Sequence, residues 1–351
     1  MQEGFIGVMG ASGYSGLEVT RLLAMHPQAR LRFCASDRWV GEPVAGRAGL
    51  RAGAAGGLSY VSAQAAEALF AGCDAVLLCT PAEVSVELVP KVLAAGAKVV
   101  DLSGAFRLED AAAYPAHYGF SHPHAELLKA ATYGLPELFR ERIRGARLVA
   151  NPGCYATVAA LALAPLMKAN LVEKDELIVD AASGVTGAGR KASEEYSFAE
   201  LSDDFRAYKA LRHQHAPEIA QTLGRAASAP PPAELAFTPH LLPLRRGILA
   251  TCYARLRPGV AAGSVASAFA DAYGPEPFVD VAASADAVSL KAVVGTNQCL
   301  VGSAVSGRRV VVTAALDNLV KGAAGQAVQN LNLALGWDES SGLASLCGRY
   351  P

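Results

Sequence analysis

A glycine-rich turn close to the N-terminus constrains the fold of this chain more than any other feature. Residues 5–9 have the apolar composition of a short buried strand, GASGYSG (10–16) follows, and a helix is expected over 17–25. The glycine spacing permits a tight turn and lets backbone N–H groups approach a pyrophosphate at the helix N-terminus. It differs from the commoner GxGxxG, yet its place directly after an N-terminal strand favours a dinucleotide site. The expected cofactor contacts in this turn are Gly10, Ser12, Gly13, Tyr14, Ser15 and Gly16.

Strands and helices continue to alternate over the first 150 residues. Further strands are expected at 31–35, 75–79, 98–102 and 147–150, with helices at 63–70 and 83–95. This alternation implies right-handed crossovers and therefore a parallel sheet. Residues 107–138 are rich in Tyr, His and Pro, and we expect a loop with short helices there.

The pattern changes after a long apolar helix expected at 155–168. Strands at 176–181, 235–238, 248–256 and 309–314 are separated by fewer helices, which indicates a mixed or antiparallel sheet. A closing helix at 316–335 carries apolar residues on one face, and we expect it to return to the first domain. A chain of 351 residues is too long for one ordinary core. The predicted organisation is α/β, with one domain of 1–153 plus 316–351 and a second of 154–315.

Composition excludes several classes of function. The net charge is −1, so neither nucleic acid nor an anionic membrane surface is an expected partner. No apolar run reaches the roughly 18 residues of a membrane span, and the N-terminus does not resemble a signal peptide. The seven cysteines are scattered and form no CxxC pair, so we expect neither a disulfide framework nor a structural metal site. A cytoplasmic location is expected.

Cys154 is the strongest candidate for a reactive group. It ends the sequence Asn-Pro-Gly-Cys between an expected strand and an expected helix, which points its thiol at the helix N-terminus. The helix dipole stabilises a thiolate there, and the free N–H groups can hold an oxyanion. The other cysteines that lie in or beside apolar runs are expected to be buried and inert; these are Cys34, Cys73, Cys79 and Cys252.

The end of the second strand bears on cofactor choice. An acidic residue at this point usually binds the ribose 2′-hydroxyl of NAD, whereas Ser and Arg suit the 2′-phosphate of NADP. The sequence Ser36-Asp37-Arg38 contains both kinds of residue, and a solvated turn is the alternative. We favour NADP, with Ser36 and Arg38 as contacts.

A pair of histidines provides the candidate acid or base. In HQHAPEI (213–219), a helix that starts near Pro217 would let His215 meet Glu218, whose carboxylate would fix the imidazole tautomer. A metal site is one alternative for this pair, but the sequence offers no third ligand nearby. An exposed surface segment is the other alternative.

These motifs together resemble the N-acetyl-γ-glutamyl-phosphate reductases of arginine biosynthesis, relatives of the aspartate-semialdehyde dehydrogenases. The resemblance covers residues 7–336 and includes NPGCYAT, DLSGAFRL, YGLPEL, SGVTGAGR, FRAYK, HQHAPEI, FTPHLLPLRRGILAT and DNLVKGAAGQAVQN. This chain has Ala156 where the family more often has Pro, and Gln214 where it more often has Arg. We expect neither position to supply chemistry.

The resemblance implies a Rossmann-type domain followed by an α+β catalytic domain of the glyceraldehyde-3-phosphate dehydrogenase-like type. It implies NADPH-dependent reduction of N-acetyl-L-glutamyl 5-phosphate to the 5-semialdehyde and phosphate through a thioester on Cys154, in a homo-oligomer, dimer or tetramer. A catalytic histidine is implied in HQHAPEI, and His215 is favoured over His213, with His213 and Glu218 at the substrate. Arg107 matches the position that binds the phosphoryl group in related reductases.

Further contacts are expected within these motifs. Arg246 could bind the substrate carboxylate, although a salt bridge is the alternative for both Arg246 and Arg107. Ser183 and Gly184 resemble the family's nicotinamide-side loop, and Asn318 would return to the cofactor domain together with Lys321.

Other functions remain open at this stage. The nearest is the same chemistry on an aminoadipyl phosphate linked to a carrier protein. An aspartate-semialdehyde dehydrogenase fits NPGCYAT and HQHAPEI poorly. A Cys/His hydrolase would leave the glycine-rich turn without a role, and the Cys154–His215 pair argues against a non-catalytic nucleotide sensor.

Overall fold

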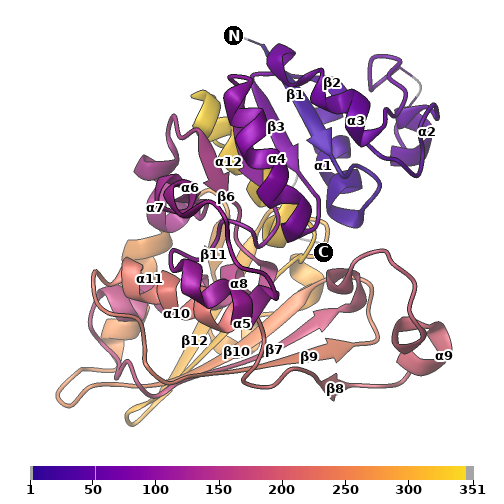
Figure 1. The fold of residues 1–351 in the computed structure, drawn as a ribbon. Coiled ribbons are helices and arrows are strands. Elements are labelled where there is room, and N and C mark those ends of the chain that lie inside the picture. Colours follow the sequence, from indigo (N-terminus) through magenta and orange to yellow (C-terminus); the bar gives the residue numbers. More distant parts are fainter. Residues whose placement is uncertain (1–2, 52, 345–351) are drawn as a thin grey trace. The chain divides into compact units, whose positions relative to one another are not determined.

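The computed structural model describes residues 3–51 and 53–344, which divide into two compact units. The first unit comprises the chain up to Gly153 and again from Ala323, and the second runs from Cys154 to Gly322. Figure 1 shows the course of the chain through both. The chain thus returns to the first unit seven residues later than the predicted boundary at 316.

The first unit is built on a six-stranded sheet in which every pairing is parallel, as the strand–helix alternation predicts. The strand order is β2-β1-β3-β4-β6-β5. The strands are β1 (Gly4–Met9), β2 (Ala29–Cys34), β3 (Ala75–Leu78), β4 (Lys98–Asp101), β5 (Thr132–Tyr133) and β6 (Leu148–Ala150). The helices are α1 (Tyr14–Ala24), α2 (Val44–Ala48), α3 (Ala63–Glu67), α4 (Ala82–Ala94), α5 (Tyr114–Tyr118), α6 (Ala125–Ala130), α7 (Pro136–Ile143) and α12 (Gly325–Leu335).

The glycine-rich turn lies where the strand order reverses. The chain leaves β1 for β2 on one side and continues to β3 on the other, so the turn after β1 occupies the topological switch point at the carboxyl ends of the strands. Gly10 has φ +70°, and a Cβ there would lie 2.4 Å from the carbonyl oxygen of Cys79. A Cβ on Gly16 would lie 2.3 Å from the carbonyl oxygen of Gly10. Both glycines are therefore required by the turn itself.

The last helix is shorter than predicted. Strand β13 continues to Leu316, a π-helical turn occupies Val320–Ala324, and α12 begins only at Gly325. The carboxylate of Asp317 accepts the N–H groups of Leu319 and Val320 and so starts the turn. Asn318 and Lys321 consequently belong to the second unit, and their predicted return to the first is wrong.

Helix α12 itself lies in the first unit, where it contacts α1, α7 and β4. Its return was predicted from its apolar positions, and Leu331 is fully buried. Asn332 accepts a hydrogen bond from the His26 ring, and Trp337 stacks on the same ring. The segment that follows α12 is thereby tied to the end of α1.

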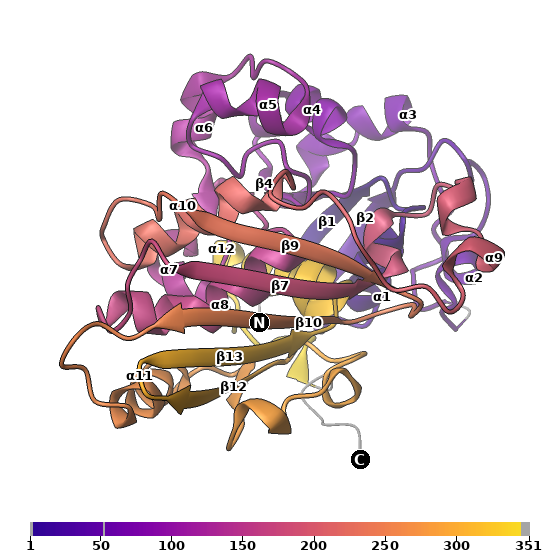
Figure 2. The ribbon, with the colours of Figure 1, turned by 90° about the horizontal axis from the view of Figure 1, so that it is seen from below.

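The second unit carries a seven-stranded mixed sheet of order β11-β12-β13-β10-β7-β9-β8. Its strands are β7 (Leu177–Gly184), β8 (Arg206–Ala207), β9 (Leu235–Leu242), β10 (Ile248–Arg255), β11 (Val279–Val281), β12 (Cys299–Ser306) and β13 (Arg309–Leu316). Its helices are α8 (Cys154–Lys168), α9 (Phe198–Leu201), α10 (His215–Ala226) and α11 (Gly263–Tyr273). Helix α8 packs on β10 and β13 and contacts both α10 and α11, while Figure 2 shows the opposite face of the sheet without a helix of this unit across it.

The two longest elements of this unit that escaped the sequence-based prediction are β12 and α11, beside the short β8, β11 and α9. Strand β12 reads CLVGSAVS, whose small residues weaken a strand pattern, and it is recognisable only through its pairing with β13. Gly302 sits within it because a Cβ there would lie 2.2 Å from the carbonyl oxygen of Ser284. Helix α11 is the other long element that was missed.

Candidate active site

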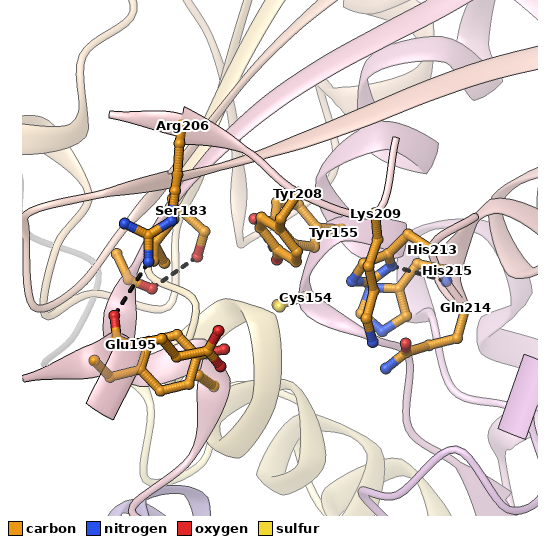
Figure 3. Close-up of a pocket in the computed structure, with 15 residues that line it drawn as sticks. Cys154, Tyr155, Ser183, Glu195, Arg206, Tyr208, Lys209, His213, Gln214 and His215 are labelled. Atoms are coloured by element: carbon orange, nitrogen blue, oxygen red, sulfur yellow. Dashed lines mark hydrogen bonds between the residues drawn. The ribbon is translucent and has the colours of Figure 1, made fainter. Parts of the chain in front are cut away.

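A cavity of about 480 Å³ lies in the second unit at the N-terminal end of α8. Figure 3 shows its lining, with the Cys154 sulfur between two groups of polar side chains. The lining consists of Cys154, Tyr155, Ser183, Gly184, Gly187, Ala188, Glu195, Tyr196, Arg206, Tyr208, Lys209, His213, Gln214, His215 and Leu241. It brings together Cys154, both histidines and the SGVTGAGR loop, which are widely separated in the sequence.

Cys154 is the first residue of α8 and is half-buried. The helix is apolar on all sides, and residues 155–167 are buried. Such a helix is stable only inside a core, and its position there directs its N-terminus toward the cavity. The thiol is thus presented at the positive end of the helix dipole, as the Asn-Pro-Gly-Cys sequence predicts.

Four of the other cysteines have the opposite environment. Burial raises the pKa of the Cys34 thiol to about 12 and that of the Cys73 thiol to about 11. Burial also raises the pKa values of Cys79 and Cys252, both of which lie in or beside sheet strands. These four thiols are therefore protonated near neutral pH and unreactive, as expected.

Burial and neighbouring charges disfavour the charged form of His213. Burial, the neighbouring His215 and the charge of Lys209 lower the pKa of His213 to about 3. Its Nδ1 accepts the backbone N–H of His215 at 3.1 Å, which fixes this ring in its neutral form. His215 is the first residue of α10, and its Nε2 lies 4.0 Å from Oε2 of the fully buried Glu218. Glu218 is one helical turn later, so the meeting of these two side chains that the sequence predicts is confirmed at ion-pair distance.

Aromatic side chains hold the histidines in place. The ring of Tyr155 packs edge-on against both His213 and His215. The Tyr208 hydroxyl donates to the Tyr155 hydroxyl, which donates in turn to the carbonyl of His240. Burial raises the pKa of Tyr155, and it raises that of Tyr208 to about 12. Tyr155 and Tyr208 are therefore uncharged near neutral pH.

The loop after β7 is held by a buried amide. The Asn318 side chain accepts the N–H of Gly247 at 2.8 Å and donates to the Thr186 hydroxyl at 3.0 Å. It thus links the loop at Ser183 and Gly184 to the Arg246–Gly247 segment. A Cβ on Gly184 would lie 2.7 Å from the Arg246 nitrogen, so the two loops are in close contact. Ser183 and Gly184 line the cavity. Asn318 does not line it but holds the loop that does.

The two predicted anion-binding arginines both have protein partners. Arg246 lies 3.6 Å from the carboxylate of the fully buried Asp317, and it is not among the lining residues. Arg107, in the first unit, donates to the carbonyls of Asn151 and Leu102 at 2.8 and 2.7 Å. The salt-bridge alternative is therefore realised for Arg246, and contacts of either arginine with substrate stay predictions.

The first unit has the features of a dinucleotide site. Helix α1 begins at Tyr14 with Gly13 as its N-cap, and no side chain caps it. At the end of β2, Asp37 accepts the N–H of Ala63 at the start of α3 and is thereby occupied. The Ser36 hydroxyl is buried and makes no hydrogen bond within the described residues, and Arg38 is exposed. An uncapped helix N-terminus, an orphaned hydroxyl and an exposed arginine fit the phosphates of NADP.

Several lining residues were not predicted. The segment FRAYK was recognised only as part of the family resemblance, yet Arg206, Tyr208 and Lys209 all face the cavity. The sequence signal that could have pointed to this segment is the pair of cationic residues Arg206 and Lys209. Gln214 also lines the cavity, so this departure from the family pattern lies at the site itself.

Residues 3–51 and 53–344 offer neither a metal site nor a membrane span. They contain no group of three His, Cys, Asp or Glu side chains placed to hold a metal ion. None of their helices combines the length and the apolar character needed to cross a membrane.

Comparison with known proteins agrees with this geometry. Residues 5–146 match the family described as semialdehyde dehydrogenase, NAD binding domain, and residues 154–318 match the semialdehyde dehydrogenase, dimerisation domain. Among solved structures, aspartate semialdehyde dehydrogenase II of Vibrio cholerae superposes with a TM-score of 0.72 at 17% identity, covering 96% of this chain and 99% of that one. A probable aspartate-semialdehyde dehydrogenase from Pseudomonas aeruginosa gives 0.67 at 20% identity, covering 95% and 99%. These structures share the fold.

Curated relatives are much closer in sequence. N-acetyl-gamma-glutamyl-phosphate reductase of Symbiobacterium thermophilum is 44% identical over 99% of both chains. The protein of that name from Magnetococcus marinus is 45% identical over 97% of both chains. With the Cys154 and His215 side chains in one cavity and this identity over nearly the full length, the chain belongs to the N-acetyl-gamma-glutamyl-phosphate reductase family of the semialdehyde dehydrogenases.

Proposed function

We propose that this chain reduces N-acetyl-L-glutamyl 5-phosphate to N-acetyl-L-glutamate 5-semialdehyde and phosphate with NADPH, as a step of arginine biosynthesis. The observation that carries the proposal is the cavity in which Cys154, at the N-terminus of a buried helix, faces His215 with its buried carboxylate partner. The names of the curated relatives supply the substrate.

The first step uses Cys154 as the nucleophile. Its thiolate attacks the acyl carbonyl, a C–S bond forms, and the C–O bond to phosphate breaks to leave a thioester. Backbone N–H groups at the start of α8 hold the oxyanion that develops at the carbonyl. We assign stabilisation of the departing phosphate to Arg107, by resemblance to related reductases.

The second step requires a hydride, which bound NADPH supplies to the thioester carbon. His215 protonates the oxyanion that hydride transfer leaves, which gives a neutral thiohemiacetal on Cys154. His215 then takes this proton back as the C=O bond forms and the Cys154 thiolate leaves with the electrons of the C–S bond. Glu218, whose Oε2 lies 4.0 Å from Nε2 of His215, is assigned to orienting the His215 ring. His213 is assigned to packing and orientation, because its pKa near 3 keeps it neutral throughout.

We assign three sets of residues to NADP. The turn residues Gly10, Ser12, Gly13, Tyr14, Ser15 and Gly16 would bind the pyrophosphate, and Ser36 and Arg38 the 2′-phosphate. Ser183 and Gly184 are assigned to the nicotinamide side. We assign Asn318 to holding their loop, since both ends of its amide already bond to protein.

The second unit matches a dimerisation domain, which supports an oligomer. We propose a homodimer or homotetramer in which a second copy covers the sheet face seen in Figure 2. Ile178 and Tyr253 project from neighbouring strands β7 and β10 and are 45% and 41% exposed, as an apolar interface requires. A biosynthetic enzyme of this kind would work in the cytoplasm.

The decisive experiment compares substrates for the purified chain. NADPH oxidation should occur with N-acetylglutamyl phosphate and be at least about a hundredfold slower with aspartyl phosphate or with carrier-linked aminoadipyl phosphate. A preference for the carrier-linked substrate would establish the lysine-type reaction instead. Hydrolysis of the acyl phosphate without NADPH oxidation would indicate a Cys/His hydrolase.

A further inference from the structure

We propose that Lys209 binds the α-carboxylate of the substrate and thereby selects an acidic acyl phosphate. This inference rests on the proposed function and adds a contact that the sequence assigned to Arg246. Lys209 follows strand β8 directly and lines the cavity. Figure 3 shows it with the histidines on one side of Cys154, while Arg206 lies on the opposite side.

Unlike the nearby arginines, Lys209 has no acidic partner in the described part of the chain. Arg206 forms an ion pair with Asp204 and donates to the carbonyl of Glu195 at 3.1 Å. Arg246 is paired with Asp317. The Lys209 ammonium makes no hydrogen bond or ion pair with any side chain in the described part of the chain, although its charge contributes to the low pKa of His213. Lys209 therefore faces the cavity, beside a neutral histidine, without a counter-ion among the described residues. An anionic ligand would supply one.

The backbone at Lys209 is held in an uncommon conformation. Its φ is +44°, in the left-handed region that residues with a Cβ seldom adopt. The flanking chain is fixed, because Tyr208 donates its N–H to the carbonyl of Pro239 and Leu211 donates to that of Phe237. Such strained positions persist where the surroundings determine them, and they cluster at ligand sites. Here the strain directs a long cationic side chain toward the cavity rather than along the strand.

The chemistry of the substrate decides which of its anions meets Lys209. The phosphate leaves from the carbon that bonds to the Cys154 sulfur, so it stays beside the helix N-terminus. The α-carboxylate lies at the far end of the glutamyl side chain from that carbon. An ammonium can bind either anion as a point charge, so position decides between them. Figure 3 shows Lys209 beside the histidines and to one side of the Cys154 sulfur, where the phosphate departs. The carboxylate therefore fits Lys209.

The reverse reaction separates the two anions, because N-acetylglutamate semialdehyde and inorganic phosphate then enter as different substrates. Lys209→Met should raise the KM for the semialdehyde about tenfold to a hundredfold, the loss expected for one charge-assisted contact. The KM for phosphate should stay within about twofold. Lys209→Arg should recover most of the affinity. Lys174→Met, at an exposed lysine of the same unit that does not line this cavity, is the matched control.

A second readout does not depend on the stability of the variant. The methyl ester of the semialdehyde lacks the α-carboxylate, so wild type should lose affinity for it and the Lys209→Met variant should not distinguish it from the acid. A raised KM for phosphate, or an unchanged KM for the semialdehyde, would overturn the assignment while leaving the proposed function intact. If the wild-type protein oxidises no semialdehyde in the presence of phosphate and NADP, both the Lys209 assignment and the proposed function are wrong.

Discussion

Gly322→Ala tests whether the π-helical turn before α12 positions the nucleophile. A Cβ at position 322 would lie 2.8 Å from the Cβ of Cys154, about 0.6 Å short of the 3.4 Å at which ordinary contact begins. It would also lie 3.2 Å from the carbonyl oxygen of Asp317 and 3.2 Å from Cδ1 of Leu316. The added methyl group therefore collides with the nucleophile residue and is crowded on two further sides.

Neither Cys154 nor the backbone at Gly322 can move without a loss of stability. The Cβ of Cys154 is bonded directly to the backbone at the start of a buried helix. Gly322 donates its N–H to the carbonyl of Asp317 at 2.8 Å, and the Asp317 carboxylate in turn accepts the N–H of Gly295 at 2.7 Å. Overpacking of this kind costs about 1–3 kcal/mol of stability. Displacement of a reacting group by about 1 Å can cost 10²-fold in rate, so we expect kcat to fall about tenfold to a hundredfold.

The assay measures kcat, KM and the alkylation rate of Cys154 by iodoacetamide on the same preparations. Alkylation is informative because burial keeps the thiols of Cys34 and Cys252 protonated. Gly263→Ala is the matched control, since a Cβ at the first residue of α11 meets no atom within 4 Å. If Gly322→Ala turns over and alkylates within about twofold of wild type, the turn does not position Cys154.

Three further predictions address the nucleophile, the cofactor and the buried histidine. Cys154→Ser should abolish turnover but retain NADPH binding, because a serine hydroxyl supplies no anion near neutral pH; more than about a tenth of wild-type activity would reject Cys154 as nucleophile. Arg38→Ala should raise the KM for NADPH by the equivalent of about 1.5–3 kcal/mol and barely change that for NADH, whereas equal effects would exclude a 2′-phosphate contact. His213 has its pKa lowered from 6.5 to about 3 by folding, so the unfolded chain binds the extra proton between these values and stability falls as pH drops from 6.5 toward 3. In urea titrations from pH 4 to 6.5, His213→Gln should flatten this dependence by up to about 1.36 kcal/mol per pH unit, and an unchanged slope would contradict the assigned burial.

Local signals in the sequence were sufficient for the framework. The turn at Gly10–Gly16 was predictable because contacts within the turn and with the adjoining strand require its glycines. Cys154 was predictable because Asn-Pro-Gly stands at a strand–helix junction, and the apolar run behind it can only be a buried helix. His215 and Glu218 are one helical turn apart, so their meeting required only that a helix begin there.

Contacts between distant segments required the tertiary structure. Lys209 enters the cavity only because β9 holds its backbone in a left-handed conformation, and Gly322 matters only because Cys154 lies 2.8 Å from where its Cβ would be. Arg246 was predicted from its charge alone, and its pairing with Asp317 depends on where β13 ends. Hydrophobic periodicity and turn chemistry act over a few residues and are written in the sequence, whereas side-chain pairing depends on strand register and packing across the whole unit.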